Sequence, residues 1–127
     1  MNQKDKELLL KDLSARLPYG VKVRYKSVEG EGDIKLGYGN IGYVPELGRG
    51  WWIECKPYLR PMSSMTEEEY KEYSKLWDLQ DEFSTDADIR FKTDVIDWLN
   101  ARHFDYRGLI ERGLAIEVAK ENNPYKE

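Results

Sequence analysis

The chain has 127 residues, of which 35% are charged and 40% are hydrophobic, and its formal net charge at pH 7 is −4. This composition excludes a disordered polyelectrolyte, and the length suits one domain with its own core. No apolar run approaches the ~20 residues of a membrane-spanning helix, and the first residues lack the apolar segment of a signal peptide. Because the single cysteine, Cys55, has no partner for an internal disulfide, we expect a cytoplasmic protein that makes no membrane contact.

The charges are unevenly distributed along the chain. Residues 16–62 carry eight Lys or Arg and five Asp or Glu, whereas residues 63–127 carry nine and sixteen. The first part is therefore mildly basic and the second is acidic. This distribution argues against non-specific nucleic-acid binding by the whole molecule, yet it permits a local basic face.

A first helix is predicted over residues 4–17. Its apolar stripe consists of Leu9, Leu10, Leu13 and Leu17, and the polar positions Lys4, Lys11, Asp12 and Arg16 lie mostly off that stripe. The helix is therefore expected to pack by one side. Pro18 disfavours the helical conformation at the residue before it and ends the helix.

Four short strands are predicted within the strand-rich segment 18–57. They lie at about 21–26, 33–38, 41–44 and 51–56, with apolar and polar residues in alternation. The glycines among residues 37–42 favour bulges or bends that curl a sheet. No connection is long enough for a crossover helix, so we expect antiparallel pairing in a small curled sheet that resembles a meander or an SH3-like barrel.

One face of this sheet is predicted to be basic, with an aromatic platform. The candidate binding residues on it are Lys22, Arg24, Lys26, Lys35, Trp52 and Lys56. Such a face suits single-stranded nucleic acid, whose bases stack on aromatic rings, or an acidic protein partner. In the alternative interpretation a helix covers Trp52, and the lysine stems lie over apolar surface at its edge.

The connector between the strand-rich and helical segments is unusually well specified. Pro57 and Pro61 lack N–H donors and are expected to end the last strand. Thr66 followed by Glu69 predicts a capping box that starts the next helix. The alternative to a simple strand-to-helix turn is a binding loop built from Tyr58, Arg60 and Met62.

The helical segment 63–118 is predicted to hold two helices, a turn and an edge strand. The helices cover residues 67–83 and 93–104, with Val95, Ile96 and Leu99 inward, and residues 84–92 form a loop. A single helical turn lies between Gly108 and Gly113, residues 114–118 form the edge strand, and the tail 119–127 is frayed.

Motifs for catalysis, cofactors and metals are largely missing. The glycine spacing matches neither a phosphate-binding loop nor a dinucleotide fingerprint, and one His with one Cys cannot form a usual zinc site. His103 and Asp105 are the candidate pair for an oriented general base. The alternative is that Asp105 caps the following turn, while Arg102 or Arg107 pairs with Asp97, Asp105 or the helix end. We expect no cofactor and no metal.

Three segments carry a resemblance to known sequences. They are RLPYGV at 16–21, KPYLRPMSSMTEEE at 56–69 and DWLNARHFDYRGLIERGLA at 97–115. These segments resemble an uncharacterised family of small proteins from gut anaerobes, their phages and their mobile elements. The resemblance implies a phage or mobile-element accessory protein and supplies no activity, cofactor or catalytic residue.

The sequence thus predicts a single α+β domain, with a leading helix and two or three C-terminal helices packed on the sheet. The expected function is that of a non-catalytic binding module with a protein or single-stranded nucleic-acid partner. The alternatives are a small enzyme that uses the His103 and Asp105 region, and a protein that sequesters a small ligand in an aromatic pocket.

Overall fold

The protein is an α+β structure, as the sequence predicts. The computed structural model describes residues 2–44, 52–80, 94–119 and 122–125. The helices are α1 (Gln3–Arg16), α2 (Glu67–Gln80) and a helix at residues 94–101, and 3₁₀ turns lie at Leu17–Tyr19, Ile41–Tyr43 and Met62–Ser64. The strands are β1 (Lys22–Ser27), β2 (Gly30–Lys35), β3 (Trp52–Pro61), β4 (Phe104–Asp105) and β5 (Ile116–Glu117).

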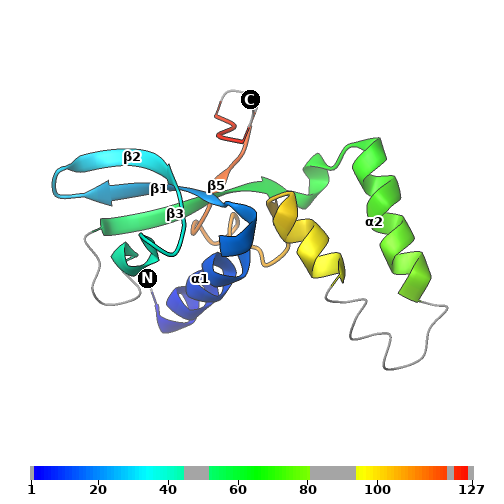
Figure 1. Cartoon of the computed structure of the whole chain (residues 1–127), viewed down its shortest axis with the longest axis horizontal. Helices are drawn as coiled ribbons and strands as arrows, with labels where there is room; N and C mark the ends of the chain where they lie inside the picture. Colours follow the sequence, from blue (N-terminus) through cyan, green and yellow to red (C-terminus); the bar gives the residue numbers. More distant parts are fainter. Residues whose placement is uncertain (1, 45–51, 81–93, 120–121, 126–127) are drawn as a thin grey trace.

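The sheet is organised around the ten-residue strand β3. Strands β2, β1 and β3 are antiparallel neighbours in that order, whereas the short strands β4 and β5 pair with the second half of β3 in parallel. In Figure 1, α2 and the 94–101 helix lie beyond the end of β3 that is remote from the β1–β2 hairpin. The prediction of a purely antiparallel sheet is wrong because β4 and β5 pair with β3 in parallel. The prediction of an SH3-like barrel is wrong because within the described residues no strand closes the sheet onto the outer edge of β2.

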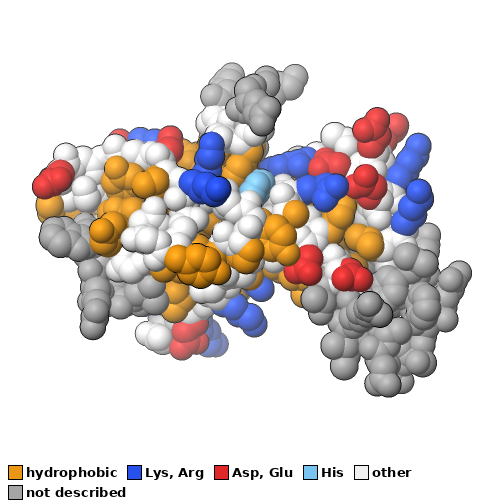
Figure 2. Space-filling view, viewed as in Figure 1, with side chains coloured by type: hydrophobic (Ala, Val, Ile, Leu, Met, Phe, Trp, Pro, Cys, Tyr) orange, Lys and Arg blue, Asp and Glu red, His pale blue; other side chains and the backbone are white. Residues whose placement is uncertain are grey.

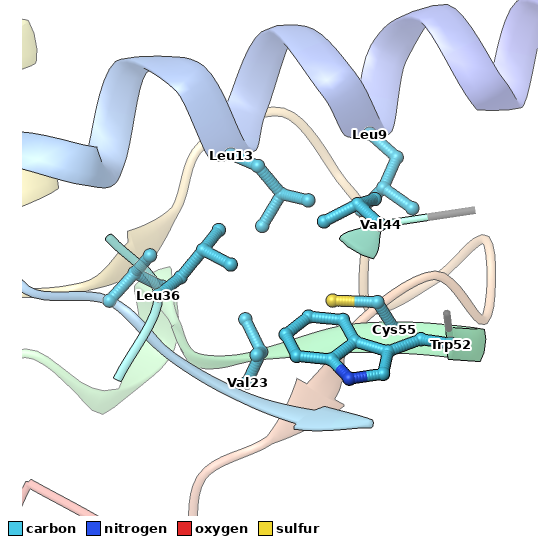
Figure 3. Packing of buried hydrophobic residues seen from close by; sticks show 8 residues of the cluster. Leu9, Leu13, Val23, Leu36, Val44, Trp52 and Cys55 are labelled. Atoms are coloured by element: carbon cyan, nitrogen blue, oxygen red, sulfur yellow. The ribbon is translucent and has the colours of Figure 1, made fainter. Parts of the chain in front are cut away.

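The main core lies between α1 and the antiparallel part of the sheet. Leu9 and Leu13 of α1 point toward Val23, Cys55 and neighbouring apolar side chains (Figure 3), and these four named residues are at most 2% exposed. The predicted apolar stripe of the first helix is therefore correct at its centre. Burial of each such aliphatic side chain contributes roughly 1.5–3 kcal/mol.

The surface positions predicted for α1 are wrong at Asp12 and Arg16. Both are completely buried, and their side chains are joined by a 2.8 Å ion pair. Arg16 also donates to the Phe104 carbonyl oxygen at 2.6 Å, and Arg107 donates to Asp12 at 3.0 Å. The cause is tertiary, since residues 104–107 contact this side of the helix and supply hydrogen bonds to both buried charges, although Arg16 Nη1 has no hydrogen-bond partner in the described part of the chain.

The third predicted strand is a 3₁₀ turn instead. The Asn40 side chain accepts the Gly37 N–H at 2.8 Å and donates to the Lys35 carbonyl at 3.2 Å. These local bonds offer the backbone an alternative to a sheet ladder. As a result β2 ends at Lys35, and Tyr38 is 81% exposed.

Strand β3 continues past Pro57 and ends at Pro61, so the predicted strand end is wrong at Pro57 and right at Pro61. The missing N–H donors of the two prolines do not interrupt the pairing, because the residues between them form the hydrogen bonds. The Arg60 N–H donates to the His103 carbonyl and the Leu59 carbonyl accepts from the Val118 N–H, each at 2.8 Å. Parallel pairing with β4 and β5 thus extends the strand after its antiparallel contact with β1.

The helical segment begins as predicted and has its own core. The Thr66 N–H donates to the Glu69 carboxylate at 3.0 Å, and the Glu69 N–H donates to the Thr66 hydroxyl at 3.1 Å, which confirms the capping box. Val95, Leu99 and Phe104 form a cluster against which Met62, Met65 and Tyr73 pack.

The predictions for Ile96 and for the loop 84–92 of this segment are not confirmed. Ile96 was predicted to point inward but is 38% exposed. The predicted loop 84–92 and the end of the preceding helix lie outside the described residues.

Candidate functional site

The five predicted basic residues do come together on one face of the sheet. Cross-strand pairing sets Lys22 opposite Lys35 and Arg24 opposite Lys56, and directly opposed residues share a face. The same registers place Glu31, Asp33 and Glu54 on this face. Arg24 lies 2.9 Å from Glu31 and 3.4 Å from Asp33, and Lys56 lies 3.6 Å from Glu54. Much of the predicted positive charge is therefore neutralised locally.

Trp52 does not belong to this face. The register between β1 and β3 shifts between Lys26 and Ser27, so that Ile53 is an extra residue and Trp52 pairs with Ser27. Such a bulge reverses the alternation at the start of β3. Trp52 is consequently only 7% exposed and stacks on Tyr25, whereas Ile53 is 66% exposed. The prediction of an aromatic platform on the basic face is therefore wrong.

Tyr58 and Arg60, predicted as binding residues, have partners within the chain. The buried Tyr58 donates its hydroxyl to Asp33 at 2.7 Å. Arg60 donates to both carboxylate oxygens of Glu69, at 2.8 and 2.7 Å, and its guanidinium lies 4.2 Å from the centre of the Phe104 ring. The hydrogen bonds from Arg60 lower the pKa of Glu69 to about 2. Arg60 therefore fixes α2 to the end of β3.

The C-terminal residues are docked on the sheet, so the predicted frayed tail is wrong for residues 122–125. The Tyr125 hydroxyl accepts the Lys22 N–H at 2.9 Å and donates to the Tyr58 carbonyl at 2.8 Å. Lys22 Nζ donates to the Pro124 carbonyl at 2.7 Å. Lys22 is thus partly covered by the chain itself, which further reduces the basic face.

His103 and Asp105 are not arranged as a general base and its orienting acid. The two carboxylate oxygens of Asp105 accept the N–H groups of Leu109 and Ile110, each at 2.9 Å, which confirms the predicted cap. His103 stacks on Tyr125 with ring centres 3.6 Å apart. Burial, and then the charges of nearby cations, lower the His103 pKa to about 4, so the ring is neutral near pH 7.

The predicted partners of the two arginines differ from the observed ones. Arg102 pairs with Glu72 at 2.9 Å, and Arg107 pairs with Asp12. Within the described residues, His, Cys, Asp and Glu form no group of three or more that would hold a metal ion. Helices in the described part of the chain are all too short or too polar to cross a membrane.

A large hollow surface lies at the junction of β3 and α2. Met62 and Tyr73 line two cavities there, of about 860 and 610 Å³. Met65 and Tyr70 complete the apolar part of the larger one. We call the surface formed by Met62, Met65, Tyr70 and Tyr73 the methionine groove. The sequence singled out Met62 as part of a binding loop, but it gave no sign that α2 would form the second wall.

The chain was also compared with known proteins. No protein-family model, curated protein or solved structure matches it. The methionine groove combines an apolar lining with exposed neighbouring charges, an arrangement suited to binding.

Proposed function

We propose that this protein is a non-catalytic binding module and that a protein partner docks in the methionine groove. The observation that carries the proposal is the position of Met62, which contributes to both cavities and joins them. A segment of the partner lying along α2 would contact both cavities at once. The resemblance of the three sequence segments supports an accessory role in a phage or mobile element.

The lining of the groove has the chemistry of a peptide-binding surface. Met62 and Met65 are unbranched and polarizable, so their side chains adapt to differently shaped apolar groups. Tyr70 is 62% exposed and offers a large ring with little entropy to lose on binding. A cavity of about 860 Å³ is large enough for several apolar side chains of a partner.

The charges around the groove favour a basic partner. Glu67 and Lys71 lie at the larger cavity, whereas Glu111 and Glu117 lie at the smaller one. Figure 2 shows acidic and basic side chains over α2, next to apolar side chains near its junction with the sheet. Because the second half of the chain has an excess of seven acidic residues, we infer a partner segment with apolar anchors and flanking Lys or Arg.

The first turn of α2, which forms one wall of the groove, is held in place by contacts within the chain. The capping box sets the first turn of α2, and the Arg60 guanidinium joins Glu69 of that turn to β3. Preorganisation of this kind lowers the entropy cost of binding.

The proposal is tested by selection from a library of helical peptides of about 15 residues, roughly four turns. We expect the selected peptides to share apolar residues at helical spacing with adjacent Lys or Arg. Tyr70→Ser should weaken their binding by about tenfold or more, since exposed aromatic anchors dominate such interfaces. Tyr38→Ser is the matched control, because Tyr38 is equally large, is 81% exposed and belongs to neither cavity.

A charge-reversal arm tests the preference for basic partners. Glu111 and Glu117 are exposed, so Glu111→Lys/Glu117→Lys should leave the fold intact and weaken binding of the basic peptides. Failure to select any peptide, or equal loss of affinity in Tyr38→Ser and Tyr70→Ser, would contradict the proposed docking site.

A second candidate function is the binding of single-stranded nucleic acid on the basic face. The shared orientation of its five cations supports it, and the three carboxylates on the same face weigh against it. Lys26→Glu/Lys35→Glu changes two exposed cations. If this face binds nucleic acid, affinity falls with added salt and is lost in the variant. An absence of binding at low salt rules out this candidate.

A further inference from the structure

A separate aromatic pocket lies at the opposite end of β3 from the methionine groove. It has a volume of about 410 Å³ and is lined by Tyr25, Ser27, Val28, Glu29, Tyr43 and Trp52. These residues come from the β1–β2 hairpin, the 3₁₀ turn at Ile41–Tyr43 and the first residue of β3. The pocket exists because the bulge opposite Ser27 turns Trp52 to the inner side of the sheet.

Three aromatic rings form the inner part of this pocket. Tyr25 and Trp52 are stacked, with ring centres 4.8 Å apart and an angle of 17° between the ring planes. Tyr43 stands edge-on to Trp52 at 5.7 Å and 69°. The rings therefore face in two directions, and their electron-rich faces create a region of negative potential.

The rim of the pocket adds a carboxylate and an exposed apolar side chain. Glu29 is the one charged residue among the described lining residues, and its carboxylate forms no hydrogen bond or ion pair with the described part of the chain. Val28 is 88% exposed at the tip of the hairpin, and Tyr43 is 40% exposed. Apolar groups beside an uncompensated negative charge match a ligand that is both cationic and apolar.

We propose that the aromatic pocket binds a methylated or quaternary ammonium ion. The methyl groups of such a cation contact ring faces and Val28, while its diffuse charge is attracted by the rings and by Glu29. A bare ammonium ion is more strongly hydrated and gains less from this environment. The ligand is either a small free cation such as choline or the trimethyllysine side chain of another protein.

The test follows the indole N–H signal of Trp52 by NMR, assigned with Trp52→Phe. Choline is titrated beside 3,3-dimethylbutanol, its uncharged isostere. We expect choline to shift the Trp52 signal and to bind roughly threefold to tenfold more tightly than the alcohol, the size of a cation–π contribution. Glu29→Gln and Tyr43→Leu should each remove most of this difference, whereas Tyr38→Leu should not.

A second arm distinguishes the two sources of the cation. Tighter binding of a trimethyllysine peptide than of choline identifies a protein side chain as the ligand, and equal binding identifies a small free cation. An unshifted Trp52 signal at millimolar choline, or equal affinity for choline and its isostere, overturns the proposal. Glu29 is exposed, so Glu29→Gln remains a valid test even if Tyr43→Leu fails to fold.

Discussion

Tyr125 fastens the C-terminal residues to the sheet with both its hydroxyl group and its ring. The hydroxyl joins the Lys22 N–H to the Tyr58 carbonyl, and the ring stacks on His103. His103 itself has a φ of 64°, a conformation that most residues avoid. One aromatic side chain thus stabilises both the tail and a strained residue.

The hydroxyl contribution is tested by Tyr125→Phe. The substitution keeps the ring and leaves the backbone groups of Lys22 and Tyr58 without a partner. We expect the free energy of unfolding to fall by about 1–3 kcal/mol. Tyr38→Phe, at an exposed position, should change it by less than about 0.5 kcal/mol. Equal stability of the two variants in urea denaturation would show that the tail is not docked as described.

His103 predicts a dependence of stability on pH. Its pKa is about 4 in the folded protein and about 6.5 ordinarily, so between these values the unfolded chain binds a proton that the folded protein does not. The free energy of unfolding should therefore be highest above pH 6.5 and fall as the pH decreases toward 4.

The matching variant is His103→Asn, since asparagine tolerates a positive φ and does not titrate. Urea denaturation between about pH 7 and pH 5 should show a loss of stability in the wild type and a flat profile in the variant. Glu69, with its pKa lowered from 4.5 to about 2, affects stability only at lower pH. A similar slope in both proteins would contradict the assignment.

Among the elements, β3 and the first turn of α2 determine where the candidate site lies. β3 pairs with β1, β4 and β5 and so positions Met62, which directly follows it. The capping box and the ion pair of Arg60 with Glu69 then fix the direction of α2. The methionine groove is a consequence of these two elements meeting at a defined angle.

The capping box is tested by Thr66→Ala. Loss of the hydroxyl acceptor for the Glu69 N–H should cost about 1 kcal/mol of stability, and Thr66→Ser should restore most of it. Ser14→Ala, within α1 and exposed, is the control and should be neutral or slightly stabilising. If thermal unfolding shows the same stability for both alanine variants, the cap contributes nothing.

For the whole molecule, the buried Asp12 network connects the two halves of the chain. Asp12 accepts from Arg16 in the same helix and from Arg107, 95 residues further along. Arg16 reaches the Phe104 carbonyl, 88 residues away. Because these contacts cross from the leading helix to the C-terminal segment, we expect residues 1–62 and 63–127 to unfold together.

Asp12→Ala tests this connection. The variant leaves the buried Arg16 without its carboxylate, which should cost about 3–5 kcal/mol. Asp5→Ala removes the surface pair with Arg112 and should cost less than about 1 kcal/mol. In the wild type, circular dichroism and tryptophan fluorescence should report one coincident transition, and two separate transitions would contradict a single unit.

The sequence by itself determined the features that depend on neighbours a few residues apart. These are the leading helix with Leu9 and Leu13 inward, the alternation in β1, the capping box at Thr66, and the cap formed by Asp105. Each is decided by backbone geometry or by a hydrogen bond spanning three to five residues. The α+β class follows from the order of these local patterns.

Only the tertiary structure decided which face of the sheet Trp52 lies on, the burial of Asp12 and Arg16, the parallel strands and the docked tail. A bulge depends on the partner strand, and a buried charge depends on donors or acceptors far along the chain. The methionine groove and the aromatic pocket have the same origin. Their walls come from segments whose meeting is set by packing and by long-range hydrogen bonds, which local residue patterns do not encode.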